Sequence, residues 1–247
     1  MATKKTLILS SNEHKRHSIF LWLTTSILAI LMAVGMTIYF NTYQASPLAR
    51  RIAKTATNHK NYLLFRSKGK VKANIIFYQG ALVEEEAYSQ LARDLADKGY
   101  NTYILKTPLN LPVLSPYKAK TIIDQNHLTN VYLAGHSLGG VVASQNAKVA
   151  PVRGLILLAS YPSSKSDLSH KKLRVLSITA SNDHILNWEK YEEAKKRLPN
   201  SSTFRTIVGG NHSRFGNYGH QKGDGKATLS HKSSEKQLAT FISNFIH

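Results

Sequence analysis

Residues 135–139, Gly-His-Ser-Leu-Gly, constrain the fold more than any other feature because they join a predicted strand to a predicted helix. The apolar run 131–134 precedes them, and the small-residue run 140–143 follows. A G-x-S-x-G turn of this kind lifts the serine hydroxyl above the end of the strand. The first N–H groups of the following helix then point at whatever the hydroxyl attacks. The pattern predicts Ser137 as a nucleophile and the N–H of Leu138 as an oxyanion donor.

The two glycines of the pattern are what make such a turn sterically feasible. Gly135 and Gly139 lie two residues before and two residues after Ser137, where a side chain would collide with the strand or the helix. The short pattern by itself also fits a tight strand-to-helix turn without chemistry. Whether Ser137 is catalytic or only part of a tight turn therefore depends on whether suitable partner residues occur elsewhere in the chain.

The rest of the chain alternates between predicted strands and predicted helices. Continuous apolar runs predict strands at 62–65, 74–78, 102–105, 131–134, 155–158, 175–178 and 204–208. Helical periodicity predicts helices at 84–99, 117–126, 138–149, 188–198 and 234–245. Alternation of this kind is typical of an α/β fold in which helices cover both faces of a mostly parallel sheet. Ligands of such sheets bind at the carboxyl ends of the strands.

Two residues that could activate a serine follow later strands of this pattern. Asp183 lies in the loop after strand 175–178, and His212 lies in the loop after strand 204–208. The order serine, acid, histidine is the one expected with this elbow. In such a triad the histidine takes the serine proton, and the carboxylate holds the histidine in the required tautomer. We therefore expect Ser137, His212 and Asp183 to act together.

Each partner has alternatives that the sequence leaves open. An Asn-Asp pair is often only a turn, which would make Asp183 a residue that caps its own loop. His184, His220 and His231 remain alternative bases. We expect His136, inside the elbow, to point away from the reacting position, and Asp124 lies within a predicted helix far from it.

An uncharged apolar segment covers residues 19–40 and is long enough to cross a bilayer core of roughly 30 Å. We expect four regions: a short basic cytoplasmic N-terminus at 1–18, a transmembrane anchor at 19–40, a linker at 41–57 and a globular domain at 58–247. A cleaved signal peptide is the competing interpretation. The length of the apolar run and the bulky Tyr43 near the candidate cleavage position favour an uncleaved anchor.

Charges on the two sides of the segment predict its orientation. The basic residues before it are Lys4, Lys5, Lys15 and Arg16, offset only by Glu13. The positive-inside rule then puts the N-terminus in the cytoplasm and the domain outside the cytoplasm. Arg50, Arg51 and Lys54 on the other side reduce the bias.

The strong positive charge belongs to the domain rather than to the anchor. The chain carries a net charge of +19, and residues 41–247 still hold 29 basic against 13 acidic residues. This predicts association with anionic lipid or an anionic cell wall. Nucleic acid is a less fitting partner because the lysines are scattered and no recognisable nucleic-acid-binding motif is present. The absence of cysteine excludes disulfides and thiolate sites and fits an exported protein.

Over residues 60–247 the chain resembles the α/β-hydrolase superfamily, and more narrowly its dienelactone-hydrolase-like branch of small esterase-like proteins. The resemblance rests on the elbow at 135–139 and on Gly209-Gly210-Asn211-His212 with the residues that follow: Phe215-Gly216, Tyr218-Gly219, Gln221 and Gly223-Asp224. It implies the same nucleophile, base and acid, Ser137, His212 and Asp183. Dienelactone hydrolases use a cysteine at the elbow, so the serine argues against that substrate.

The resemblance also implies a second oxyanion donor. Relatives often carry His-Gly-Gly after the third strand, where this chain has Gln79-Gly80-Ala81, so the donor would be the backbone N–H of Ala81. We expect a membrane-anchored serine hydrolase of a carboxylic ester, with a small or lipid-like acyl substrate, no metal and no cofactor. A thioester, an amide and acyl transfer remain open. The alternative is a non-catalytic surface protein that binds anionic wall polymer or lipid.

Overall fold

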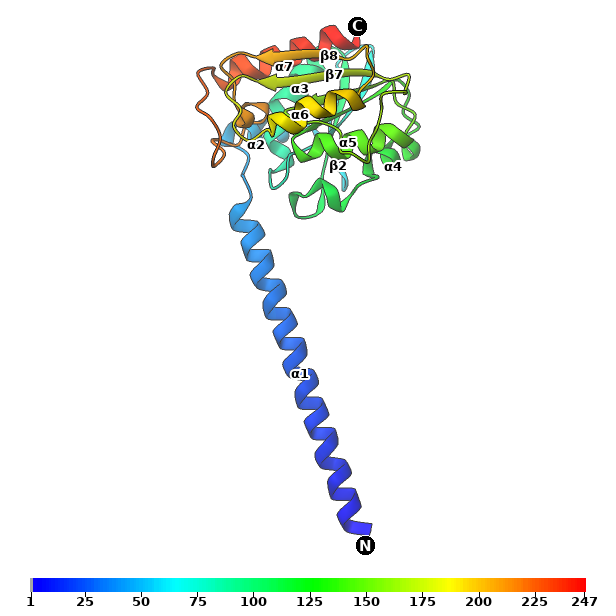
Figure 1. Cartoon of the computed structure of the whole chain (residues 1–247), viewed down its shortest axis with the longest axis vertical. Coiled ribbons are helices and arrows are strands. Elements are labelled where there is room, and N and C mark those ends of the chain that lie inside the picture. The colour runs from blue at the N-terminus through cyan, green and yellow to red at the C-terminus, as the bar shows by residue number, and fades with distance from the viewer. Residues whose placement is uncertain (1) are drawn as a thin grey trace. The chain divides into compact units, whose positions relative to one another are not determined.

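The computed structural model describes the backbone of residues 2–247 and the side chains of residues 17–247 (Figure 1). The chain forms two compact units, residues 1–41 and 42–247. The basic residues before His17, on which the predicted orientation depends, lie outside the described side chains.

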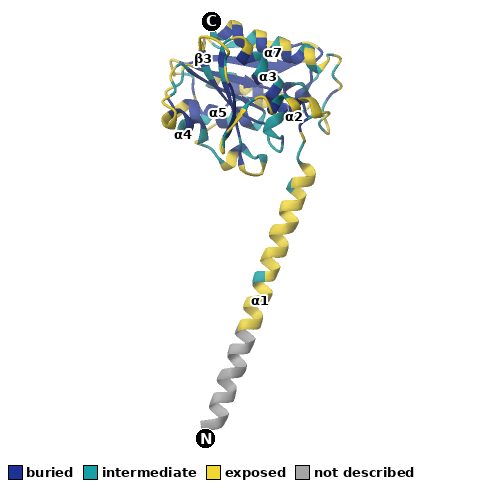
Figure 2. Cartoon of the chain, turned by 180° about the vertical axis from the view of Figure 1, so that it is seen from behind, coloured by how far each residue is buried: buried dark blue, intermediate teal, exposed yellow. Residues whose placement is uncertain are grey.

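The first unit is one helix, α1 (Ala2–Asn41). Its stretch His17–Asn41 is long and apolar enough to span a membrane, a property that signal sequences share. The side chains of this stretch are almost all exposed, in contrast to the buried sheet of the second unit (Figure 2). A helix that is apolar on every face is typical of membrane spans and of helices buried in a large core.

The second unit is built on an eight-stranded sheet with the order β1-β2-β4-β3-β5-β6-β7-β8. Six neighbouring strands are parallel: β4 (Tyr100–Leu105), β3 (Ala73–Tyr78), β5 (Val131–His136), β6 (Gly154–Leu158), β7 (Arg174–Ala180) and β8 (Thr203–Ile207). The short strands β1 (Thr57–Asn58) and β2 (Tyr62–Phe65) pair antiparallel at one edge. The predicted α/β fold with a mostly parallel sheet is confirmed.

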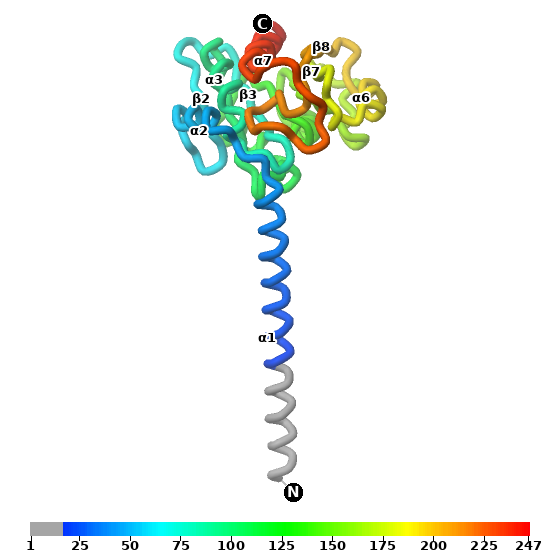
Figure 3. Tube along the Cα trace, turned by 90° about the vertical axis from the view of Figure 1, so that its left-hand side faces the viewer, coloured from blue at the N-terminus to red at the C-terminus, as the bar shows by residue number. Residues whose placement is uncertain are grey.

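Helices cover both faces of the sheet, so each central strand contributes to two cores. In β3, Ile75 and Phe77 belong to one core, and Ile76 and Tyr78 belong to the other. The first core is covered by α2 (Pro47–Ala53), α3 (Ser89–Asp97) and α7 (His231–Ile246), with α7 packed on α3 (Figure 3). The second is covered by α4 (Lys118–Gln125) and α5 (Leu138–Val149), and α6 (Trp188–Ala194) bonds to the same face. Burial on both faces explains why the strands read as continuous apolar runs.

The expected linker at 41–57 is a structured part of the domain, so that prediction is wrong. Ala49 and Ala53 of α2 are buried in the first core. Glu84 fastens this segment, because its Oε2 lies 2.8 Å from the N–H of Ala45 and 2.9 Å from Arg50. The small side chains of these alanines allow α2 to lie close against α3.

Candidate active site

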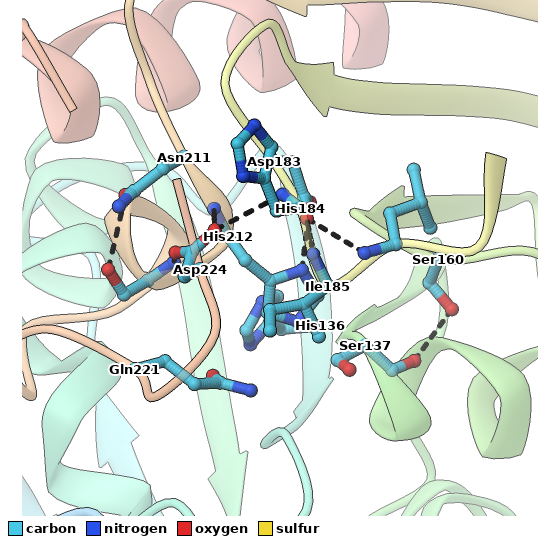
Figure 4. A network of polar contacts seen from close by, with 12 residues as sticks. His136, Ser137, Ser160, Asp183, His184, Ile185, Asn211, His212, Gln221 and Asp224 are labelled. Carbon is cyan, nitrogen blue, oxygen red and sulfur yellow. Dashed lines mark hydrogen bonds and ion pairs between the residues drawn. The ribbon is translucent and has the colours of Figure 1, made fainter. Parts of the chain in front are cut away.

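The serine elbow connects β5 to α5. Ser137 has φ 51° and ψ −124°, a backbone conformation that few residues other than glycine adopt. Its N–H donates to the Leu158 carbonyl at 2.9 Å, and its own carbonyl accepts from the Ser160 hydroxyl at 2.6 Å. These bonds to the end of β6 hold the strained turn in place (Figure 4).

The two glycines are required by close backbone contacts. A Cβ on Gly135 would lie 2.4 Å from the carbonyl group of Gly139. A Cβ on Gly139 would lie 2.2 Å from the carbonyl oxygen of Gln79, just after β3. The steric reason for the G-x-S-x-G pattern is therefore present in this chain.

Asp183 and His212 form a buried pair at the ends of β7 and β8. The Oδ2 atom of Asp183 lies 2.8 Å from Nδ1 of His212, and both side chains are excluded from solvent. The other oxygen, Oδ1, accepts from the N–H groups of Ile185 and Leu186 at 2.9 and 2.8 Å. Asp183 thus both caps its own loop and orients the histidine, which combines the two interpretations that the sequence left open.

A second carboxylate, Asp224, holds the backbone of the histidine loop. Its oxygens accept from the N–H groups of His212, Ser213 and Gly225 at 3.2, 2.9 and 2.8 Å (Figure 4). Asn211 donates to the Gly225 carbonyl at 2.6 Å and ties the two ends of this loop together. No local pattern in the sequence predicts this role for Asp224, although Gly223-Asp224 belongs to the motif that resembles the α/β-hydrolases.

His136 is buried directly beside the base. Its ring centroid lies 4.6 Å from that of His212 and 5.5 Å from that of Phe215. The Tyr88 hydroxyl accepts from the N–H of Gly80 at 2.9 Å and donates to Nδ1 of His136, also at 2.9 Å. Burial holds the pKa of His136 well below its usual value, so its imidazole is neutral. As expected, it does not line the cleft at Ser137, but it forms one wall around His212.

Ser137 and His212 line the same cleft, about 230 Å³ in volume, at the carboxyl edge of the sheet. Nε2 of His212 is buried and has no partner among the described residues. It is the atom that a triad uses to accept the serine proton. The side chain of Leu138 also lines this cleft.

None of the competing residues reaches this cleft. His184 and His220 are exposed, and Nε2 of His231 is bonded to Arg214. Asp124 is exposed on α4 and pairs with Lys120 at 2.6 Å. Of the histidines weighed from the sequence, His212 alone among the described residues shares the cleft with Ser137.

Ala81 lies in the turn after β3, two residues after Gln79, whose carbonyl approaches Gly139. No described residue accepts a hydrogen bond from its N–H. The preceding residue, Gly80, donates instead to Tyr88. The N–H of Ala81 thus remains available as an oxyanion donor.

Strained residues gather around this edge of the sheet. Positive φ angles occur at Leu82, in the turn that follows β3, and at Ser137 and Ala159, directly after β5 and β6. Such angles in residues with side chains persist only where the surrounding structure holds them, and they cluster at functional sites. Around Ser137, residues with positive φ angles follow three neighbouring strands.

Comparison with known proteins shows the family of this chain. Residues 74–237 match the model of the alpha/beta hydrolase family. The chain belongs to the α/β-hydrolase family. The match does not distinguish the dienelactone-hydrolase-like branch, which stays a prediction, and no curated protein matches the sequence.

Solved structures of α/β-hydrolases superpose on the domain at low sequence identity. Est1E from Butyrivibrio proteoclasticus is 15% identical with a TM-score of 0.57, covering 75% of this chain and 93% of that one. An alpha-beta serine hydrolase homologue from Coxiella burnetii is 15% identical with a TM-score of 0.56, covering 74% and 90%. The esterase domain of a Rhodothermus marinus protein is 12% identical with a TM-score of 0.56, covering 75% and 93%. At these identities the likeness extends to the fold.

This α/β-hydrolase carries no helical lid between β6 and β7. Residues 159–173 form only turns and bends, and Tyr161 from this stretch lines the cleft. The other wall comes from Ile185 and Leu186, which Asp183 fixes through its Oδ1 atom. The cleft is therefore small and is not covered by a helix.

Proposed function

We propose that this α/β-hydrolase is a serine hydrolase that cleaves carboxylic esters through an acyl-enzyme. The observation that carries the proposal is the buried pair Asp183–His212, whose unpartnered Nε2 adjoins the cleft onto which Ser137 opens. A satisfied structural histidine would use both ring nitrogens. A general base needs one nitrogen left for the substrate side.

The reaction takes two steps. Ser137 Oγ attacks the ester carbonyl while His212 Nε2 takes its proton, and the N–H groups of Leu138 and Ala81 stabilise the oxyanion. The alkoxide leaves as an alcohol with the proton from His212, and the acyl group stays on Ser137. Water then attacks the acyl-enzyme, gives its proton to His212, and the proton returns to Ser137 as the acid leaves. Throughout, Asp183 Oδ2 accepts from Nδ1–H and stabilises the imidazolium.

The proposal is tested by labelling with a fluorophosphonate, which reacts with activated serines. Wild-type chain should gain one adduct by intact mass, and Ser137→Ala and His212→Ala should gain none. His184→Ala is the matched control, because it removes an exposed neighbouring histidine and should label like wild type. A folded wild type that stays unlabelled would exclude catalysis and favour the non-catalytic alternative, a binding protein for anionic wall polymer or lipid.

We further propose that α1 anchors the enzyme in the cell membrane, with the N-terminus in the cytoplasm and the domain outside. The support is the apolar stretch His17–Asn41 and the basic residues that precede it. Protease added to intact cells should then digest the domain. Digestion only after cell lysis would reverse the orientation, and release of the domain into the medium would favour a cleaved signal sequence.

A further inference from the structure

Residues 107–117 form an uncharged segment in a strongly charged protein. The sequence Thr-Pro-Leu-Asn-Leu-Pro-Val-Leu-Ser-Pro-Tyr follows β4 and contains none of the chain's 33 basic or 14 acidic residues. It includes the short helices η2 (Pro108–Asn110) and η3 (Pro112–Leu114). We call it the 107–117 segment.

The apolar side chains of the 107–117 segment are turned to the solvent. Residues 42–247 expose ten large apolar side chains, and four of them lie here: Leu109, Val113, Leu114 and Tyr117, at 52, 46, 51 and 61% exposure. Scattered exposed apolar residues are ordinary, but a group of this kind marks an interaction surface. The segment therefore exposes apolar surface that is solvated unfavourably by water.

The segment is held in this exposed arrangement by the fold. Leu109 and Asn110 both have φ 55°, and the Asn110 carbonyl accepts from the N–H of Leu82 at 2.8 Å. η3 packs against α5, and the Asn146 amide donates to the Pro116 carbonyl. Strain in a bulky residue such as Leu109 needs this support. The exposed side chains are thus presented by fixed backbone contacts.

The location of the segment relates it to the active site. It begins at the carboxyl end of β4, the same sheet edge that carries Ser137. Its bond to Leu82 joins it to the turn that contains Ala81, and η3 lies along the helix that Ser137 starts. A partner bound to the segment would lie close to the entrance of the cleft.

The charges around the segment favour an anionic partner. Three lysines lie at the two ends of the segment, Lys106 before it and Lys118 and Lys120 after it, and two carboxylates, Glu85 and Asp124, lie close to them. The wider domain carries a large positive excess. Exposed apolar side chains bordered by lysines are the pattern of segments that insert shallowly into anionic bilayers.

We propose that the 107–117 segment docks on the surface of an anionic lipid bilayer, with Leu109, Val113, Leu114 and Tyr117 inserted at the headgroup level. Docking presents the cleft of the α/β-hydrolase to lipid-borne acyl groups. The catalytic benefit of docking rests on the proposed function, and the presence of a bilayer beside the protein rests on the proposed membrane anchor.

The absence of cysteine allows a direct test in the full chain. Val113→Cys, labelled with NBD, is reconstituted into vesicles of phosphatidylcholine and phosphatidylglycerol that contain a nitroxide lipid. Val149→Cys is the matched control, because it is also an exposed valine but lies at the far end of α5. Since interfacial side chains lie roughly 5–10 Å deep, we expect about threefold stronger quenching at position 113 than at position 149. Replacing phosphatidylglycerol by phosphatidylcholine should reduce this difference.

Equal quenching at the two positions would overturn the proposal. So would a blue shift at position 113 without quenching, which would indicate contact with protein, such as a second copy of the chain. A third label, at Met32→Cys, reports on α1 independently. Quenching at 32 but not at 113 would refute docking and leave the anchor, whereas fluorophosphonate labelling in the same vesicles reports separately on the hydrolase.

Discussion

Asp183 uses its two carboxylate oxygens for different purposes. Oδ1 accepts two backbone N–H groups of its own loop, and Oδ2 accepts from His212. The bonds to the loop prevent rotation of the carboxylate, so the orientation of His212 follows from that of the loop. A substitution that replaces only one of the two carboxylate oxygens of Asp183 can therefore change catalysis without disturbing the structure of the loop.

We predict that Asp183→Asn lowers kcat for a chromogenic ester about 10⁴-fold with little loss of stability. The asparagine oxygen can still cap the loop, but its NH₂ group would favour the His212 tautomer that protonates Nε2. Asp224→Asn is the control, because Asp224 bonds only to backbone N–H groups. It should cost about 1–2 kcal/mol of stability and much less activity. Equal kcat losses in both variants would contradict the assignment.

Glu235 is a buried carboxyl group that does not line the active-site cleft. It is 4% exposed on α7, and burial, together with the nearby Asp94, raises its pKa from 4.5 to about 7. The folded chain therefore keeps this proton between pH 4.5 and 7, where the unfolded chain has released it. The contribution of the group to stability is complete below about pH 4.5 and is lost as the pH rises to 7.

Because glutamine cannot ionise, Glu235→Gln should gain stability over wild type as the pH rises. We expect a gain near zero at pH 4.5 and about 3 kcal/mol at pH 8, from the 1.36 kcal/mol that each pKa unit represents. Urea unfolding at the two pH values measures it. Glu192→Gln, at an exposed ion pair with Lys195, should show little change at either pH. A gain for Glu235→Gln that is independent of pH would contradict the raised pKa.

At the scale of elements, the active site depends on how closely α5 approaches β3 and β5. Both approaches are backbone contacts, at Gly135 against Gly139 and at Gly139 against Gln79. Backbone cannot move aside as a flexible side chain can. The helix N-terminus that would stabilise the oxyanion is therefore held by the same contacts that require glycine.

We predict that Gly139→Ala destabilises the domain by about 3 kcal/mol, the upper range for overpacking, and removes fluorophosphonate labelling. Gly69→Ala is the matched control, because a Cβ at that turn would meet no atom within 4 Å. It should unfold at the same urea concentration as wild type. An unchanged unfolding midpoint for Gly139→Ala would show that the elbow can relax.

For the whole molecule, the corrected domain boundary changes which fragment folds. Among residues 17–247, whose side chains are described, the two cores draw only on the second unit, and Ala45, Ala49 and Ala53 belong to the first core. Tyr43 also bridges to Val83 beside the site. The smallest independent unit therefore begins near Thr42.

We predict that fragment 42–247 unfolds cooperatively in urea. Fragment 58–247 should lose about 3 kcal/mol or more, because removal of α2 exposes apolar area of the first core. Equal urea midpoints of unfolding for the two fragments would show that residues 41–57 act only as a linker.

The amino-acid sequence by itself determined the order of strands and helices, the elbow and the identity of the candidate triad. These depend on local patterns: apolar runs bounded by turns, glycines around a serine, and polar residues directly after strands. Because parallel strands end at one sheet edge, residues 46 and 29 positions apart in the chain meet there, as Ser137, Asp183 and His212 do.

Only the tertiary structure decided the roles of α2, Asp224, His136 and the 107–117 segment. α2 places only Ala49 and Ala53 in the first core, too weak a pattern for its sequence to predict burial, and it packs against α3. Asp224 and His136 lie 12 and 76 positions, respectively, along the chain from His212. Asp224 accepts from the backbone N–H of His212, and the His136 ring packs beside its ring. Exposure of the apolar side chains at 107–117 follows from backbone angles and contacts that no local pattern encodes. Local chemistry selects which residues can act, whereas packing selects which of them are brought together.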